Sequence, residues 1–319
     1  MYCGTSVFAS ESQALALLKG VEQERMKYDC FTVTYTETRK DEGNKTVTQI
    51  VDFDHGKMRK VHLKTRDFSG WSEVLNGDEF YRFVHKPNED VALTDSNSGQ
   101  SRYSGLYDPR ILGLTSIAHF SSTVHASLLF GRLSGFTVED TTLDGKPIKR
   151  VSVSDGDQLW EMYIDEPGFR LWKTAYTSPA LNTSVNNRYD DPNLGPFPSE
   201  SHVVRIRGKK TIEDRTFKVT GFEVKKSFPP DTFTYKGMDL PLNVAVVDYR
   251  IHRRAGYWDG EKLVDDPVRM SAQERRDWEA KRDGQPLGNI ARYVLMGAGI
   301  LMIVYALYSM RQKRLKNQA

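Results

Sequence analysis

Cysteine is scarce in this sequence, and no set of metal-ligating residues takes its place. Cys3 and Cys30 are the only cysteines among 319 residues, and in principle they could pair with each other. The chain has no CxxC motif and no combined cysteine and histidine set. A structural zinc site needs four such ligands at short spacings. We therefore expect neither a metal nor another cofactor.

Motifs of established catalytic chemistry are also missing. The sequence has no GxSxG, Walker A, GxGxxG or HExxH motif, and its seven histidines show no metal-ligand spacing. Asp190-Asp191 and Asp265-Asp266 each precede a proline in a polar loop, which favours solvated turns over paired catalytic carboxylates. We expect a protein that is not an enzyme. The alternative is an unrecognised hydrolase.

The sequence has no strong excess of charge of either sign. It contains 45 Lys and Arg against 42 Asp and Glu, with a net charge of +3. Proteins that bind nucleic acids usually carry a strongly basic surface, so we expect no such partner. The last nine residues hold a local basic cluster that suits an anionic membrane surface. Its members are Arg311, Lys313, Arg314 and Lys316.

One long stretch combines high hydrophobicity with a complete lack of charge. Tyr293–Met310 reads YVLMGAGILMIVYALYSM, with no charged residue and no proline. As a helix it would be roughly 27 Å long, close to the thickness of a bilayer's hydrocarbon core. Arg292 flanks it on one side and the basic tail flanks it on the other. We predict a transmembrane helix over residues 290–310. A buried core helix is the alternative.

The distribution of basic residues predicts how this helix is oriented. The positive-inside rule places the tail, residues 311–319, in the cytoplasm and the large domain outside it. Basic residues within 275–282 work against this assignment. Val7-Phe8-Ala9 resembles the end of a signal-peptide cleavage site, so residues 1–9 are interpreted as the remnant of a longer signal. A tail-anchored protein with a cytosolic domain is the alternative.

Hydrophobic periodicity predicts one helix followed by many strands. Residues 10–27 carry apolar side chains at helical spacing. From Cys30 the period changes to two, and strands follow at intervals of ~10–12 residues, separated by turns such as Asn76-Gly77. A second helical segment is predicted at 114–133. Residues 251–289 are expected to form a juxtamembrane spacer, with a turn at 256–260 and a short charged helix.

The period-two pattern also predicts which side chains face the interior of the sheet. These residues would either form an ordinary core or line an apolar cavity, and the pattern alone leaves both open. The predicted inward-facing, candidate ligand-binding residues are Phe31, Val33, Tyr35, Val51, Phe53, Val61, Leu63, Trp160, Met162, Ile164, Phe169 and Leu171.

The order of these elements resembles the LolA/LolB-type lipoprotein-carrier fold. That fold also has a helix, many antiparallel strands, a helical insert in mid-sequence and further strands. The resemblance covers residues 10–250 and is closest in kind to divergent LolA-like proteins of planctomycete-type bacteria. The stretches that carry it are Tyr107–Gly113, Phe228–Phe233, and Val246–Arg250 followed by Gly256–Gly260.

This resemblance implies an α+β, mainly β domain, in which covering helices close a curved antiparallel half-barrel over an apolar cavity. Domains of this kind hold acyl chains or hydrophobic segments. We therefore expect a single-pass protein of the bacterial inner membrane whose periplasmic domain binds a lipid or a lipoprotein acyl chain. It would differ from the soluble carriers in being tethered. The alternative is a membrane-tethered protein-interaction or envelope-signalling module with a filled core and no ligand.

Overall fold

The computed structural model describes residues 4–63, 65, 69–86, 89–96, 108–114 and 135–268. The first 267 residues form one compact unit and the remainder forms a second unit. No helix within the described ranges is long and apolar enough to cross a bilayer. Several predicted features lie outside these ranges: the span at 290–310, the tail at 311–319, the helical segment from 115 to 133, and Arg292, Arg311, Lys313, Arg314 and Lys316.

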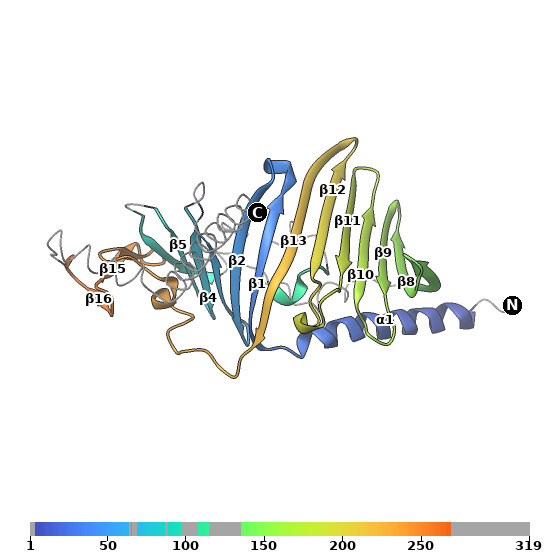
Figure 1. Ribbon diagram of the computed structural model, residues 1–319, viewed down its shortest axis with the longest axis horizontal. Coiled ribbons are helices and arrows are strands. Elements are labelled where there is room, and N and C mark those ends of the chain that lie inside the picture. Colours follow the sequence, from blue (N-terminus) through green and yellow to red (C-terminus); the bar gives the residue numbers. More distant parts are fainter. Residues whose placement is uncertain are drawn as a thin grey trace, which may run out of the picture. The chain divides into compact units, whose positions relative to one another are not determined.

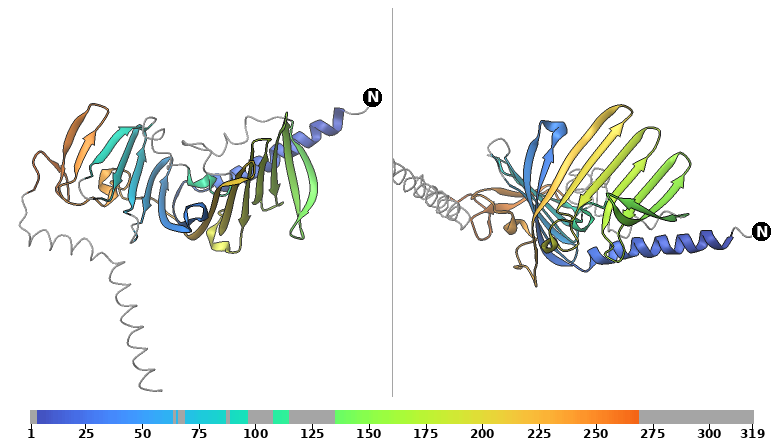
Figure 2. Two further views of the ribbon diagram at one scale, coloured as in Figure 1. Left: turned by 90° about the horizontal axis from the view of Figure 1, so that it is seen from above. Right: turned by 45° about the vertical axis from the view of Figure 1, so that its right-hand side comes forward.

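A single curved, unclosed sheet dominates the first unit (Figures 1 and 2). Its sixteen strands within the described ranges lie in the order β16-β15-β14-β6-β5-β4-β3-β2-β1-β13-β12-β11-β10-β9-β8-β7. The first group is β1 Cys30–Arg39, β2 Lys45–Asp54, β3 Lys57–His62, β4 Trp71–Asn76, β5 Glu79–Val84 and β6 Val91–Asp95. The second is β7 Thr137–Leu143, β8 Lys146–Asp155, β9 Gln158–Ile164, β10 Leu171–Thr177, β11 Leu181–Arg188, β12 Glu200–Arg207 and β13 Lys210–Val224. The last is β14 Ala245–Asp248, β15 Arg253–Trp258 and β16 Leu263–Val264.

Most neighbouring strands are joined by the short turns that the sequence predicts. Asp54 pairs with Lys57 across the β2–β3 turn, and Asn76 pairs with Glu79 across the β4–β5 turn. The two antiparallel groups β1–β6 and β7–β13 meet where β1 pairs with β13, with Val33 opposite Phe222. This pairing makes one continuous sheet of the two groups. The prediction of a mainly β domain with a curved, open sheet is confirmed.

The region after β13 differs from the prediction. The chain passes to the edge of the first group of strands, where β14 pairs in parallel with β6 and Val246 lies opposite Val91. Residues 256–258, predicted as a turn, belong to strand β15. Gly256 has φ +152°, and a Cβ added to it would lie 2.9 Å from Cβ of Leu263 on β16. This glycine therefore permits close strand approach, and the sheet extends past residue 250 into the stretch assigned to the spacer.

Helix α1, Gly4–Met26, precedes the sheet and confirms the predicted helix, although it begins earlier. Residues 4–9, interpreted as a signal remnant, are part of it. Its buried row follows the i, i+3, i+4, i+7 spacing of a helix face. That row is Ala14, Leu17, Leu18 and Val21. Leu15 is 38% exposed because it lies one position off this row.

The core lies on both faces of the sheet. We call the face that carries Phe31, Val33 and Tyr35 the concave face, and residues 108–114 and α1 pack on it (Figure 2). The opposite, convex face has its own apolar cluster, which residues 228–240 cover. Its buried members are Val74, Tyr81, Phe83, Val91, Leu93, Phe233, Met238, Leu240, Val246 and Trp258.

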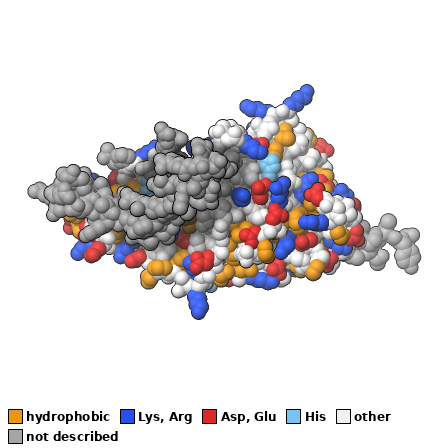
Figure 3. Space-filling view, in the orientation of Figure 1, with side chains coloured by type: hydrophobic (Ala, Val, Ile, Leu, Met, Phe, Trp, Pro, Cys, Tyr) orange, Lys and Arg blue, Asp and Glu red, His pale blue; other side chains and the backbone are white. Residues whose placement is uncertain are grey.

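Over β8–β13, the side of the molecule seen in Figure 3 is polar, with acidic and basic side chains interspersed. Cross-strand ion pairs account for part of this pattern. Arg150 on β8 contacts both Glu139 on β7 and Glu161 on β9, and His202 on β12 lies 2.9 Å from Asp214 on β13. Charges of opposite sign therefore compensate one another on this surface.

Candidate functional site: the concave face and its cover

The middle of the concave face is a tightly packed aromatic cluster. Phe31 on β1 lies with its ring centroid 5.4 Å from that of Phe53 on β2 and 5.6 Å from that of Phe197. Leu112 packs into the same cluster and is 1% exposed. Such tilted aromatic pairs are favourable geometries for buried rings. Residues outside the strands therefore fill this part of the face.

A second apolar cluster lies between α1 and strands β8 to β10. Met162, Ile164 and Leu171 are at most 3% exposed and pack against the buried row of α1. Phe169, in the β9–β10 turn, rests on the helix at Gly20. A Cβ at Gly20 would lie 2.3 Å from Cδ1 of Phe169. The glycine thus lets the ring contact the helix backbone directly.

The structure brings together most of the predicted inward-facing residues, in two groups. Phe31, Val33, Tyr35, Val51 and Phe53 belong to the central cluster. Met162, Ile164 and Leu171 belong to the second, with Trp160 and Phe169 packed against it.

Val61 and Leu63 do not join either group. The register of β2 and β3 places Lys60 opposite Val51 and His62 opposite Gln49, so Lys60 and His62 share the concave face. Val61 therefore points to the convex face, and Leu63 is 39% exposed. Side chains alternate between the two faces along a strand. Our assignment of β3 was out of phase by one residue, so it placed Val61 on the wrong face.

Residues 108–114, which we call the strap, cross the concave face without pairing as a strand. Side chains from three elements bind its carbonyl oxygens. Nη1 of Arg25 on α1 donates to the oxygens of Arg110 (3.3 Å) and Leu112 (3.0 Å). Two further hydrogen bonds complete the attachment, from Nδ2 of Asn187 to the Gly113 oxygen (2.6 Å) and from Oγ1 of Thr174 to the Leu114 oxygen (3.0 Å).

Arg110 fixes the strap from within. Its Nε and Nη2 donate to the Asp108 carboxylate, and its Nη1 donates to Asp29 at 2.9 Å. The guanidinium also lies over the Phe53 ring, 4.5 Å from the centroid. A buried cation is tolerated when it is paired and hydrogen-bonded in this way. The arginine thus joins the strap to the aromatic cluster.

A row of charged and polar side chains continues the concave face beyond the apolar clusters. This polar row crosses strands β5, β4, β3, β2, β1, β13 and β12. Its members are Arg82, Glu73, Lys60, Gln49, Glu37, Arg39, Arg215, Glu213 and Arg205. Our sequence reasoning missed the row because it followed apolar residues only. Glu37 and Arg39 nevertheless continue the phase of Phe31, Val33 and Tyr35 along β1.

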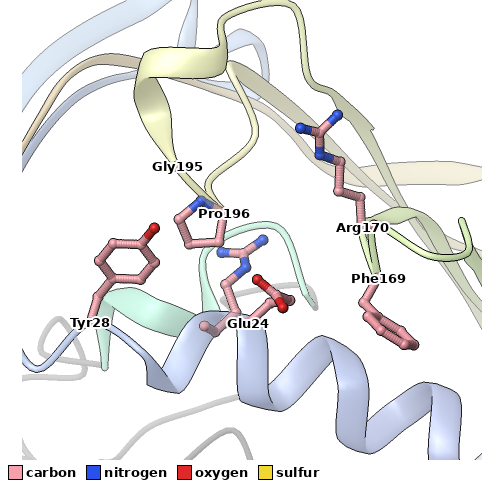
Figure 4. A pocket seen from close by; sticks show the side chains of 8 residues that line it. Glu24, Tyr28, Phe169, Arg170, Gly195 and Pro196 are labelled. Atoms are coloured by element: carbon pink, nitrogen blue, oxygen red, sulfur yellow. The ribbon is translucent and has the colours of Figure 1, made fainter.

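A polar pocket of about 240 Å³ opens beside the C-terminal end of α1 (Figure 4). Three chain segments line it: the last turns of α1, the β9–β10 turn, and the loop after the short 3₁₀ helix Pro192–Leu194. The lining residues are Glu24, Arg25, Tyr28, Gly168, Phe169, Arg170, Gly195 and Pro196. Sequence reasoning did not find this pocket, because its residues come together only through the packing of α1.

One side-chain pair on the other face has the form of a nucleophile and its base. Oγ of Ser72 lies 2.9 Å from Nε2 of His85. Ser72 is only 1% exposed, and its hydroxyl also contacts the Met238 carbonyl oxygen. A substrate therefore has no access to this hydroxyl in the present conformation. Within the described ranges no group of three or more His, Cys, Asp or Glu side chains is placed to hold a metal ion.

Comparisons with known proteins give similarities to solved structures only. No protein-family model matches the chain, and no curated protein matches it. A LolA-superfamily protein of Nitrosomonas europaea is 13% identical, with a TM-score of 0.43, covering 70% of this chain and 99% of that one. A DUF1329-family protein of Desulfovibrio piger is 8% identical, with a TM-score of 0.42, covering 72% and 99%. The MucA/MucB complex of Pseudomonas aeruginosa gives 12% identity and a TM-score of 0.30, covering 70% and 60%.

Proposed function

We propose that this protein is a membrane-anchored binding module, without catalytic activity, that takes up an acyl chain of a lipid or lipoprotein on its concave face. One observation carries the proposal. The strap lies over apolar clusters and is attached through side chains, not through a strand ladder. Arg25, Asn187 and Thr174 donate hydrogen bonds to it, and its own Arg110 pairs with Asp29. The strap can therefore leave while the sheet stays intact.

Displacement of the strap would break several contacts. Four hydrogen bonds hold its carbonyls, and at about 1 kcal/mol net each they contribute roughly 4 kcal/mol, beside the Arg110–Asp29 ion pair. Ile111, Leu112 and Leu114, each at most 1% exposed, would also leave the apolar clusters. A bound acyl chain would bury the same apolar surface in their place, at about 0.8 kcal/mol per methylene group.

The proposed location follows from the expected C-terminal span. The domain faces the periplasm from the bacterial inner membrane, with residues 311–319 in the cytoplasm. A tethered domain takes a ligand from its own membrane, or passes one to a neighbour, more readily than it carries one across a compartment. Protease treatment of spheroplasts tests the orientation. Digestion of the domain in intact spheroplasts supports the proposal, and protection of the domain until lysis contradicts it.

A specific observation favours a second candidate function. Phe197 and Leu112 already fill the space above Phe31 and Phe53, and each is 1% exposed. A face filled by its own side chains suits a membrane-tethered protein-interaction or envelope-signalling module that binds no lipid.

Photochemical labelling of the full chain in lipid nanodiscs separates the two candidates. The probe is a fatty acid that carries a diazirine and an alkyne, and mass spectrometry identifies the labelled peptides. The acyl-binding proposal expects label on peptides that contain Phe31, Phe53 or Met162, and expects excess oleate to remove it. Label confined to residues 290–310, or label that oleate does not reduce, would overturn it.

A matched pair of variants sharpens this experiment. Thr174→Val removes the hydroxyl that binds the Leu114 oxygen and loosens the strap. Thr177→Val makes the same change at an exposed position of the same strand. The proposal expects more label on the concave face in Thr174→Val and unchanged label in Thr177→Val. Equal labelling of both variants would show that the strap does not control access.

A further inference from the structure

Two guanidinium groups line the pocket beside α1, and both lie near the ring of Tyr189. Arg25 lines the pocket from the helix, and Arg170, which Figure 4 labels, lines it from the β9–β10 turn. The Arg170 guanidinium lies 5.5 Å from the centroid of the Tyr189 ring. Burial lowers the pKa of the Arg25 guanidinium, and the neighbouring Tyr189 phenol only partly opposes this shift. Arginine remains charged in proteins, so two positive charges meet here.

Neither guanidinium is neutralised by a carboxylate of the described chain. Nη1 of Arg25 is used on the strap carbonyls, while Nη2 is buried and has no hydrogen-bond partner. Arg25 as a whole is 2% exposed. The Arg170 side chain forms no ion pair within the described residues, since the nearby Asp165 carboxylate accepts from the Arg170 backbone N–H and from Trp172. A buried donor without a partner is costly, which points to a missing acceptor.

Three opposing features together are weaker than this positive charge. Glu24 also lines the pocket, but its carboxylate pairs with Lys27, with Nζ 2.5 Å from Oε1. The Asp165 carboxylate lies beside Gly168 of the lining and carries one full negative charge. The C-terminal end of α1 adds a partial negative charge of about half an electron. The two guanidinium charges exceed the sum of the Asp165 charge and this partial charge, so the pocket is electropositive.

We propose that this pocket binds the phosphoryl group of a phosphate ester or of free phosphate. Its volume of about 240 Å³ is smaller than the ~300–1,000 Å³ of typical sites for larger ligands, so it suits a headgroup-sized ion. Tyr28 and Arg170 lie on different sides of the pocket (Figure 4), and Arg25 adds a second guanidinium to its lining. Phosphate has more oxygens than a carboxylate and can accept hydrogen bonds from all three side chains. A phosphate dianion also balances both guanidinium charges.

This site is separate from the proposed acyl site, although Arg25 contributes to both regions. Its Nη1 holds the strap, and its Nη2 would bind the phosphoryl group. An anion there would fix the guanidinium in the orientation that retains the strap. The pocket can therefore be tested whether or not an acyl chain binds to the concave face.

Isothermal titration calorimetry of the full chain in a phosphate-free maltoside detergent tests the proposal. The probes are inorganic phosphate, glycerol 3-phosphate, dihexanoyl phosphatidic acid and acetate. We expect saturable binding of the phosphoryl compounds and little binding of acetate. Tighter binding of phosphatidic acid than of phosphate would identify a lipid headgroup as the source, and equal binding would identify free phosphate. No saturable binding at millimolar concentration, or equal affinity for acetate, would overturn the proposal.

Two arginine variants show whether the binding occurs in this pocket. Arg170→Gln removes an exposed guanidinium from its rim, and we expect affinity for phosphate to fall by about tenfold or more. Arg188→Gln removes another exposed arginine, which is paired with Glu200 on the other face of the sheet. Unchanged affinity in Arg188→Gln supports the assignment. An equal loss in both variants, or no loss in Arg170→Gln, would show that the binding lies elsewhere.

Discussion

Two buried glutamates lie on the polar row of the concave face, and their surroundings have opposite effects. Glu37 is on β1 and its side chain is 5% exposed, while Glu73 is on β4 and its side chain is 3% exposed. Burial raises the pKa of each carboxyl group. At Glu37, hydrogen bonds and charges from Arg39, with the charges of Lys60 and Arg215, outweigh burial and lower the pKa. At Glu73 burial prevails, and the pKa is raised.

Donor geometry explains this difference. Glu37 accepts hydrogen bonds from Nε of Arg39 (2.8 Å), Nη1 of Arg215 (3.1 Å) and Nε2 of Gln49 (2.6 Å). Glu73 lies 3.8 Å from Nε of Arg82 and also feels the charge of Lys60, but its Oε2 accepts no hydrogen bond from the described residues. Burial and nearby cations are similar at the two sites and thus do not decide the charge state. The hydrogen bonds that each carboxylate accepts decide it.

The largest expected effect comes from Glu37→Gln. The change leaves the half-buried Arg39 and Arg215 guanidiniums without the buried carboxylate that they share, and breaking such a pair costs about 3 kcal/mol. Urea unfolding of the full chain in a non-ionic detergent, followed by tryptophan fluorescence, measures the loss of unfolding free energy. A loss as small as that of Glu73→Gln would show that donor geometry does not distinguish the two sites.

Arg215→Met should make Glu37 more like Glu73. It removes the hydrogen bond from Nη1 of Arg215 to Glu37, together with the 3.2 Å contact of Arg215 with Glu213, while keeping much of the side-chain volume. We expect a loss of about 2 kcal/mol, since hydrogen bonds to charged groups contribute about 1.5–3 kcal/mol. The same unfolding experiment measures it. Arg188→Met, at an exposed position paired with Glu200 at 3.9 Å, is the matched control and should change stability little.

The two glutamates should also give opposite pH dependence. The pKa of Glu37 is lower when folded, so its stabilisation is present above the ordinary value of 4.5 and is lost as pH falls through the folded pKa. The pKa of Glu73 is higher when folded, so its contribution is present below 4.5 and is lost as pH rises through the folded pKa. Unfolding free energies of wild type and each Gln variant, measured from acid to neutral pH, test this. Differences of the same sign would contradict the comparison.

The smallest expected effect is that of Glu73→Gln at neutral pH. The neutral amide replaces a carboxylate whose charged form is disfavoured by burial. We expect the unfolding free energy to change by no more than about 1 kcal/mol in either direction. A buried carboxylate that accepts few hydrogen bonds gains little from its surroundings, so its loss costs little. The unfolding free energy at neutral pH measures it. A loss comparable to that of Glu37→Gln would show that Glu73 forms stronger contacts than its geometry indicates.

The sequence predicts the parts of this fold that depend on neighbouring residues. The Asn76-Gly77 turn is local, and the structure has it between the paired strands β4 and β5. The parallel contact of β14 with β6 depends on a chain return that no local pattern specifies. Gly256 was misassigned for the same reason, since its role is set by the approach of β16.

The candidate site shows the same limit. Period-two alternation places Phe31, Val33 and Tyr35 correctly on the concave face. Lys60 faces inward, where the carboxylates of Glu73 and Glu37 compensate its charge. Both carboxylates come from other strands, so the neighbouring sequence does not reveal them. A rule that assigns apolar residues to the interior selects Val61 instead. Polar interiors depend on partners that are distant in sequence, so the polar row appears only in the folded structure.

The pairing of β1 with β13 has a consequence for how the chain is assembled. β1 is synthesised early and finds β2 at once, but its other neighbour is made only after β7 to β12. Until then one side of β1 presents unpaired backbone groups, which is the hazard of any exposed strand edge. Pairing across such a sequence separation is also slow. The centre of the finished sheet is therefore an edge until β13 has been made, and substitutions in β1 should affect the yield of folded protein more than equal substitutions in β9.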